Sequence, residues 1–243
     1  MKITLDKQQL DELQAHPLLR WIRKYRYSFL FGAILAQFAL LPFFENRMRI
    51  FVPVLFLLIV LAVLFTLDLR KAVFGVCFAL GLLSTILFIL GRALRVSPAT
   101  ETNYVMVAMI LDVVFLSFVL YVLMVKIFAE ERVSRETIKG GFSVYFLLGY
   151  LWAYLYSMIL LLNPQAISFS MPNVELSNII YFSFTTLTTL GYGDITPVTW
   201  MARNLTILES VIGQFFLTVF IARLVAQELA NRSLHVRGPS KDK

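Results

Sequence analysis

The sequence predicts an all-α integral membrane protein in which six helices span the bilayer and a further, shorter helix enters it and returns. Hydrophobic residues make up 59% of the chain and charged residues only 15%, with a mean hydropathy of +0.77. Soluble domains carry roughly 25% charged residues, so this composition excludes a water-soluble globule. Long windows with few or no charges recur along the chain, and a short apolar segment that ends in Gly-Tyr-Gly lies between the last two.

The uncharged windows predict the spanning helices, because each is about long enough to cross the roughly 30 Å of bilayer hydrocarbon. They are residues 28–44, 50–67, 72–90, 104–125, 142–162 and 204–226. The opening residues are polar and no apolar stretch begins before Ser28, so a secretory signal peptide is not expected. Cys77 is the only cysteine, which excludes an intrachain disulfide, and we interpret it as a small core residue.

The distribution of basic residues predicts the orientation of the chain. With the N-terminus in the cytoplasm, most of the 22 Lys and Arg residues fall on the cytoplasmic side. Those left outside are Arg47, Arg49, Arg92, Arg95 and Arg203. The positive-inside rule therefore places both termini in the cytoplasm, and we expect a multi-pass protein of the cell (plasma) membrane. This asymmetry accounts for the net charge of +7 without a nucleic-acid partner.

The chain divides into five predicted parts. Residues 1–26 predict a cytoplasmic helix and then an interfacial helix, whose aromatic and basic side chains suit the layer of lipid headgroups. Residues 27–126 form a four-helix front domain with short connections. Residues 127–141 mix acids and bases at helical spacing, which predicts an amphipathic linker along the inner face; a plain solvated connector is the alternative. A second membrane domain (142–226) and a cytoplasmic tail (227–243) follow.

Asp112 in the front helices and the pair Gly140-Gly141 at the end of the linker carry two further predictions. Asp112 is the one acid inside the four front helices. A charge at membrane depth indicates a functional site, whereas the alternative is a structural Asp that is protonated or paired with Arg92 or Arg95. The pair Gly140-Gly141 would let the chain turn from the linker into the membrane, because glycine accepts backbone angles that other residues avoid.

The run Asn178–Thr188, with Ser177 as its predicted N-cap, is about eleven residues or roughly 17 Å long. It is too short to span and long enough to enter halfway and return, so we interpret it as a re-entrant helix. Its C-terminal end would aim a partial negative charge at the membrane centre, which favours cations there. The preceding segment contains Asn163-Pro164 and Met171-Pro172, typical of an extracellular loop.

Glycine alternates with larger residues in the segment Thr188-Thr189-Leu190-Gly191-Tyr192-Gly193-Asp194. Aiming successive carbonyl groups at one axis needs alternating left- and right-handed backbone angles, and glycine takes a positive φ without a steric penalty. Rings of such carbonyls can replace the hydration shell of a cation. Non-helical backbone at membrane depth is tolerated where it lines a water- or ion-filled path.

From the aromatic run Tyr181–Thr186 through this segment to Ile195-Thr196-Pro197, the sequence resembles the pore helix and selectivity filter of the potassium-channel family. The resemblance implies a homotetramer with K⁺ as the permeant ion and no other cofactor, because each chain supplies one strand of the filter. It implies K⁺ binding at Thr189, Leu190, Gly191, Tyr192 and Gly193, filter support by Thr188, and Asp194 at the outer mouth. Leu190 departs from the valine or isoleucine that is more usual.

Four helices ahead of a pore pair resemble the voltage-gated members of that family. The stretch Tyr104–Val125 contains no basic residue, however, so steep voltage gating through this helix is not expected. In the last helix, Asn204–Ala226, the resemblance implies a hinge at Gly213, and close helix packing is the alternative. Leu217, Ile221 and Val225 follow Gly213 on one face and are gate candidates. Glu209 is interpreted as a buried group hydrogen-bonded near the re-entrant helix.

The sequence therefore predicts a channel for passive, potassium-selective conduction, with membrane lipid and copies of itself as its partners. Two alternatives are kept: a weakly selective cation channel, and a membrane sensor or regulatory subunit that does not conduct. No enzyme and no small-molecule substrate are predicted, because His16 and His235 lie at opposite ends of the chain and no nucleotide-binding motif or cysteine cluster is present.

Overall fold

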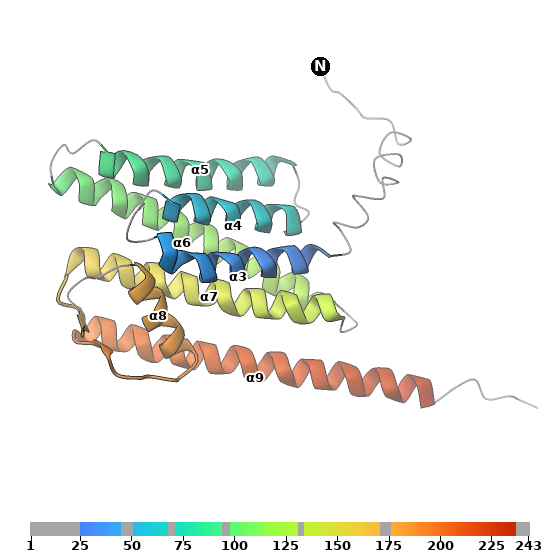
Figure 1. The fold of residues 1–243 in the computed structure, drawn as a ribbon. Coiled ribbons are helices and arrows are strands. Elements are labelled where there is room, and N and C mark those ends of the chain that lie inside the picture. The colour runs from blue at the N-terminus through green and yellow to red at the C-terminus, as the bar shows by residue number, and fades with distance from the viewer. Residues whose placement is uncertain are drawn as a thin grey trace, which may run out of the picture.

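The computed structural model describes residues 25–44, 51–67, 71–93, 98–130, 134–170 and 176–236. The helices predicted within residues 1–24 lie outside this part of the chain. The front half contains four helices: α3 (Arg26–Phe44), α4 (Phe51–Leu67), α5 (Lys71–Ala93) and α6 (Pro98–Ala129). Figure 1 shows them side by side, with α3 packed on α4 and on the following helix α7, and α5 packed on α6.

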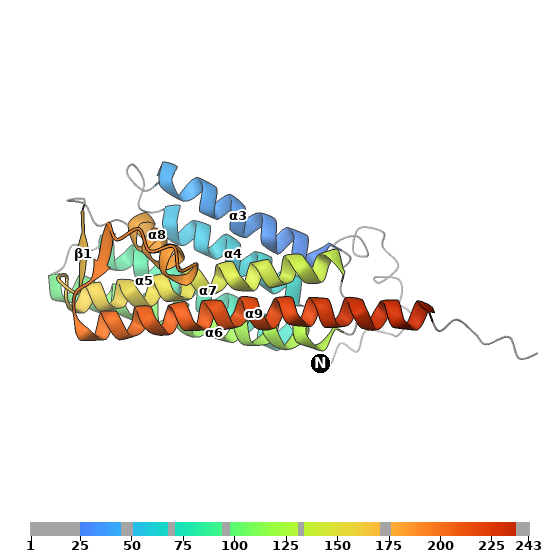
Figure 2. The same cartoon turned by 90° about the horizontal axis from the view of Figure 1, so that it is seen from below.

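The second half contains α7 (Arg135–Leu162), the short helix α8 (Leu176–Leu187) and the long helix α9 (Trp200–Val236). Two short strands flank α8, β1 (Ile167–Phe169) and β2 (Ile195–Pro197), and they pair antiparallel with Ser168 opposite Thr196. α8 lies near the N-terminal end of α9, and α9 extends beyond the ends of the other helices (Figure 2). The chain is thus mostly helical.

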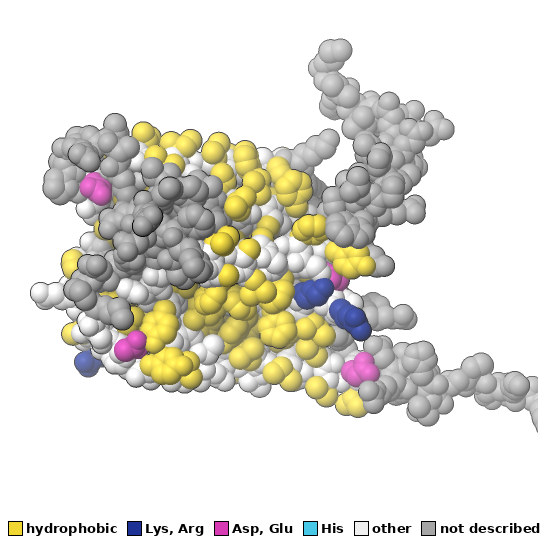
Figure 3. Space-filling view, viewed as in Figure 1, with side chains coloured by type: hydrophobic (Ala, Val, Ile, Leu, Met, Phe, Trp, Pro, Cys, Tyr) yellow, Lys and Arg dark blue, Asp and Glu magenta, His cyan; other side chains and the backbone are white. Residues whose placement is uncertain are grey.

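Four of the described helices are long and apolar enough to cross a membrane, over residues 72–91, 100–129, 135–162 and 200–230. The described apolar parts of α3, α4 and α8 are shorter. On the face shown in Figure 3, apolar side chains cover the middle of the molecule and charged side chains gather at its two ends. This arrangement is that of a multi-pass membrane protein, and six spans remain a prediction.

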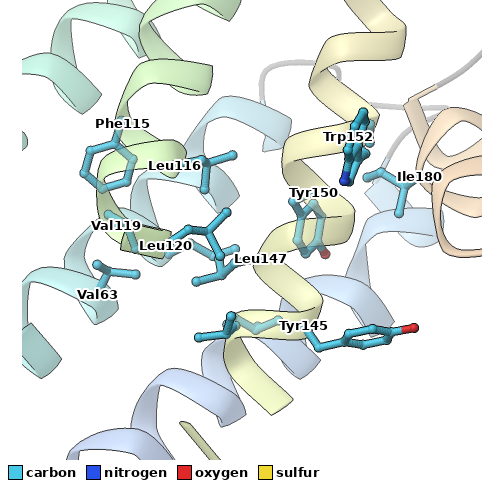
Figure 4. Close-up of a cluster of buried hydrophobic side chains, with 14 of the residues drawn as sticks. Val63, Phe115, Leu116, Val119, Leu120, Tyr145, Leu147, Tyr150, Trp152 and Ile180 are labelled. Atoms are coloured by element: carbon cyan, nitrogen blue, oxygen red, sulfur yellow. The ribbon is translucent and has the colours of Figure 1, made fainter. Parts of the chain in front are cut away.

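The apolar core lies on both sides of α7 (Figure 4). On one side Leu147 is completely buried against the α6 residues Leu116 and Leu120. On the other side Trp152 lies beside Ile180 of α8. α7 therefore connects the front helices to the short helix.

The linker predicted over 127–141 differs from the structure. Residues 127–129 complete α6, and α7 begins at Arg135 after Ser134, whose side chain caps the helix in a capping box with Thr137. Gly140 and Gly141 lie inside α7 instead of forming a turn. A Cβ added at Gly141 would lie 2.0 Å from the ring of Phe220 on α9, so this glycine serves close packing between α7 and α9.

Two further boundaries need correction. α8 begins at Leu176, so Ser177 lies within its first turn and does not precede the helix as an N-cap. α9 continues to Val236, whereas the prediction ended it at Ala226 and treated residues 227–243 as a tail. The residues after 226 contain no glycine or proline before Gly238, so nothing in the sequence stops the helix earlier.

A junction at the end of α6 connects the front helices to the C-terminal half of α9. The Glu130 carboxylate accepts hydrogen bonds from Arg26 (3.4 Å) and Tyr27 (3.5 Å) of α3. Its backbone carbonyl accepts a hydrogen bond of 2.8 Å from Arg223 and another of 2.8 Å from Gln227, both on α9. The guanidinium of Arg223 also lies 4.8 Å from the ring centroid of Phe128.

Candidate functional site

Glu209 is a buried residue of α9 that contacts both α7 and α8. Its side chain is fully buried, and its carboxylate accepts hydrogen bonds of 2.5 Å from Tyr156 of α7 and 2.5 Å from Ser183 of α8. The expected hydrogen bond near the re-entrant helix is therefore present. A buried carboxylate is costly unless such donors are supplied, so this triad fixes α7, α8 and α9 at one point.

The last four backbone carbonyls of α8 all accept hydrogen bonds, although the end of a helix leaves these groups without partners in the helix itself. The donors come from the following loop, from α7 and from α9. Phe184 accepts from the Thr188 amide and hydroxyl, Thr185 from the Leu190 and Gly191 amides, Thr186 from the Thr189 amide and the Ser210 hydroxyl, and Leu187 from the Tyr145 hydroxyl. The loop after α8 is thus attached to the helix end.

Three residues of that loop have a left-handed backbone: Thr189 (φ 60°), Gly191 (φ 53°) and Gly193 (φ 80°). They stand at every second position, as the alternation expected from the sequence requires. Among the described residues Thr189 is the only non-glycine with a positive φ, and that conformation costs an ordinary residue about 1–2 kcal/mol.

The exposed side of this loop carries backbone oxygens. The amides of Leu190 and Gly191 converge on the Thr185 carbonyl, at 2.8 and 3.1 Å. Because the peptide bonds are trans, the C=O of each peptide points opposite to its N–H. The carbonyl oxygens of Thr189 and Leu190 therefore point away from α8, and residues 188–194 are all exposed.

Two contacts support the outer end of the loop. The ring of Tyr192 stacks on that of Tyr181 of α8, with centroids 6.3 Å apart and planes 4° apart. The Asp194 carbonyl accepts hydrogen bonds from the Ser170 amide (3.2 Å) and hydroxyl (2.6 Å). The strand pair β1–β2 is thereby continuous with the loop.

The sequence of this region was compared with those of known protein families. Residues 108–228 match a family model described as ion channel. The chain carries an ion channel domain. The match covers the larger part of α6 and all of α7, α8 and the candidate loop. The matched domain is of the two-helix pore type. It is the domain of a channel and not of an enzyme. No curated protein and no solved structure matched the chain.

Within the ion channel domain, Gly213 serves close packing. A Cβ at this position would lie 2.5 Å from the Leu187 carbonyl oxygen and 2.8 Å from the Leu187 Cδ1, so α9 touches the end of α8 here. Of the gate candidates on the same helix, Leu217 packs against the core, while Ile221 and Val225 are more than half exposed. The hinge and gate roles of these residues stay predictions.

Asp112 of α6 is buried. It accepts a hydrogen bond from the hydroxyl of Ser84 on α5, and that hydroxyl also lies 3.3 Å from the Ala108 carbonyl. The expected partners Arg92 and Arg95 lie outside the described side chains. Ser84 is thus the partner that the structure provides, and a gating role for Asp112 stays a prediction.

The sequence interpretation missed Ser183, Tyr156, Ser210, Tyr145 and Gln214, which hold α8 and its loop. Each is a polar or hydroxyl-bearing residue in an apolar helix window. A buried polar group needs a hydrogen-bond partner, so these isolated positions are the signal that could have found them.

We expect Gly213→Ala to lower the free energy of unfolding by about 1–3 kcal/mol, because the new methyl group must push α9 away from a backbone carbonyl. Thermal unfolding of the purified protein in detergent measures this change. Gly75→Ala is the matched control, since a Cβ at this glycine of α5 would meet nothing within 4 Å. Equal melting temperatures for the two variants would contradict the packing role of Gly213.

Proposed function

We propose that the protein is a potassium-selective channel in which ions pass down their electrochemical gradient through a pore made by four identical chains. The observation that carries this proposal is the loop after α8, with its left-handed backbone at Thr189, Gly191 and Gly193 and its exposed carbonyl oxygens. Closely spaced backbone oxygens can take the place of the water molecules around a monovalent cation.

A ring of loops follows from the geometry of such a site, and the number four comes from the resemblance to potassium-channel filters. One loop presents oxygens from one side only, and a dehydrated cation needs them on all sides. A ring of identical loops around a cyclic symmetry axis supplies this, and a potassium filter uses four. The exposure of the loop in a single chain, with Leu190 at 56% and Tyr192 at 67%, supports the proposal that other copies cover it.

In this proposal K⁺ binds at the oxygens of residues 189–193, Thr188 supports the loop and Asp194 stands at the outer mouth. α8 ends at Leu187 directly before the loop, so its partial negative charge adds to the attraction for cations. The front helices regulate or support the pore without a charged voltage sensor, because the only basic residue in the last turn of α6 is Lys126 and the preceding turns back to Tyr104 have none. The chain crosses the cell membrane with both termini in the cytoplasm.

Cation flux through the protein in liposomes tests the proposal. We expect potassium to pass far faster than sodium under matched gradients. Equal potassium and sodium flux would replace the proposal with a weakly selective cation channel. No current at any voltage, pH, tension or lipid composition would indicate a sensor or regulatory subunit that does not conduct.

A further inference from the structure

Gln214 of α9 contacts the first residue of the candidate ion-binding loop. Its side-chain amide donates a hydrogen bond of 3.3 Å from Nε2 to the hydroxyl oxygen of Thr189. Ser210, one turn earlier, donates from its hydroxyl to the Thr186 carbonyl at 3.2 Å. Ser210, Gly213 and Gln214 share one face of the helix because they stand at i, i+3 and i+4, so this face of α9 follows the end of α8 into the loop.

Gly213 explains why Gln214 can reach the loop. With no side chain at Gly213, the Leu187 carbonyl sits 2.5 Å from the point where a Cβ would be, and the two backbones approach closely. The next residue along α9 then stands beside Thr189. The side chains of Gln214 and Thr189 are both exposed in the single chain, on the side where the pore is proposed.

The Thr189 hydroxyl is held by two hydrogen bonds. It donates its proton to the Thr188 carbonyl at 2.6 Å, and it accepts from Gln214. A hydroxyl has one proton and two lone pairs. With the proton directed at Thr188 and one lone pair directed at the amide, the second lone pair has a fixed direction.

We propose that Gln214 is a positioning residue for the innermost cation site, where it holds the Thr189 hydroxyl so that its second lone pair binds a dehydrated monovalent cation. This inference rests on the proposed function and adds to it a residue outside the filter. Without the amide donor, only the bond to the Thr188 carbonyl orients the hydroxyl, so its lone pairs are no longer held in one direction and bind the cation more weakly. Gln214 then acts through Thr189 and does not itself touch the ion.

Block of the potassium current by barium in a planar bilayer tests the proposal. Barium is close to potassium in size and carries twice the charge, so it reports on the oxygen ligands of a cation site. The decisive variant is Gln214→Met, which keeps an unbranched side chain of similar length but has no donor. We expect barium to block this variant about threefold to tenfold more weakly, the worth of one hydrogen bond, while the protein elutes as the same oligomer.

A double-mutant cycle separates positioning from a general effect on the cavity. Thr189→Ala removes the hydroxyl, so adding Gln214→Met to it should change barium block no further. Thr218→Val, one turn further along the exposed side of α9, is the control that removes another polar group and should leave block unchanged. If Gln214→Met fails to assemble, Gln214→Leu replaces it in the same cycle.

Wild-type barium affinity in Gln214→Met, or equal effects of this substitution with and without the Thr189 hydroxyl, would overturn the inference and leave potassium conduction intact. Absence of potassium current in the wild-type protein would overturn the proposed function and this inference with it. The two failures are therefore distinguishable in one series of recordings.

Discussion

Gly191→Ala is expected to reduce potassium flux about tenfold or more while the protein still folds and assembles. Gly191 has a φ of 53°, and a Cβ there would meet nothing within 4 Å. The effect therefore comes from the backbone and not from a steric clash with a neighbour. A left-handed alanine costs about 1–2 kcal/mol, and the cost falls on every copy of the loop, so the loop relaxes to a negative φ and its carbonyls leave the positions they hold now.

Potassium efflux from liposomes measures the change, and size-exclusion chromatography checks assembly. Leu190→Val is the matched control: it alters the adjacent residue, whose φ is not positive, and only its carbonyl is proposed to face the ion. We expect this control to conduct potassium. Wild-type flux through Gly191→Ala would mean that the left-handed backbone at this residue has no role in conduction.

Glu209→Ala is expected to destabilise the protein more than any other single change discussed here. Truncation leaves the buried hydroxyl of Tyr156 without its acceptor, whereas the Ser183 hydroxyl loses its bond to α9 and keeps the Gly149 carbonyl at 2.8 Å. An unsatisfied buried polar group costs about 1–3 kcal/mol, and the removed side chain also leaves a cavity, so we expect a loss of about 2–5 kcal/mol in the free energy of unfolding. Because Ser183 belongs to α8, the helix should also lose its position, and potassium flux should fall together with thermal stability.

Glu209→Gln separates hydrogen bonding from charge. The glutamine keeps one side-chain oxygen and nearly the same volume, so it can accept from one of the two hydroxyls. We expect its loss of stability to be less than half of that in Glu209→Ala. The thermal midpoint and the flux of both variants, measured in the same detergent and lipid, provide the comparison. A Glu209→Ala protein as stable as wild type would show that the triad contributes nothing to the position of α8.

Structural features that depend only on neighbouring residues in the chain could be predicted from the sequence. The alternation of glycine in residues 188–194 is local, and the left-handed backbone at Gly191 and Gly193 follows from the lack of a Cβ. The apolar windows likewise indicated where the helices lie, because hydrophobic length is a property of a continuous stretch. The left-handed backbone of Thr189 fits the same alternation but has no local signature of its own, since no local rule places a β-branched residue there.

Features that depend on contacts between distant residues could not be predicted. Glu209 pairs with residues 26 and 53 positions away, and nothing in a single sequence selects these hydroxyls from the others. The interpretation of Gly140-Gly141 as a turn failed for the same reason. A glycine pair permits a turn and permits close packing equally well, and the ring of Phe220, far along the chain, decides for packing.

The Glu130 junction has a mechanical consequence. Two donors from α9 share one backbone oxygen at the end of α6, and the bond from a charged donor such as Arg223 is worth about 1.5–3 kcal/mol. If α3–α6 tilt, the part of α9 around Arg223 and Gln227 must therefore move with them, or both bonds must break at once. The two bonds couple α6 to the C-terminal part of α9, so a displacement of α3–α6 relative to α7 is transmitted to that part of α9.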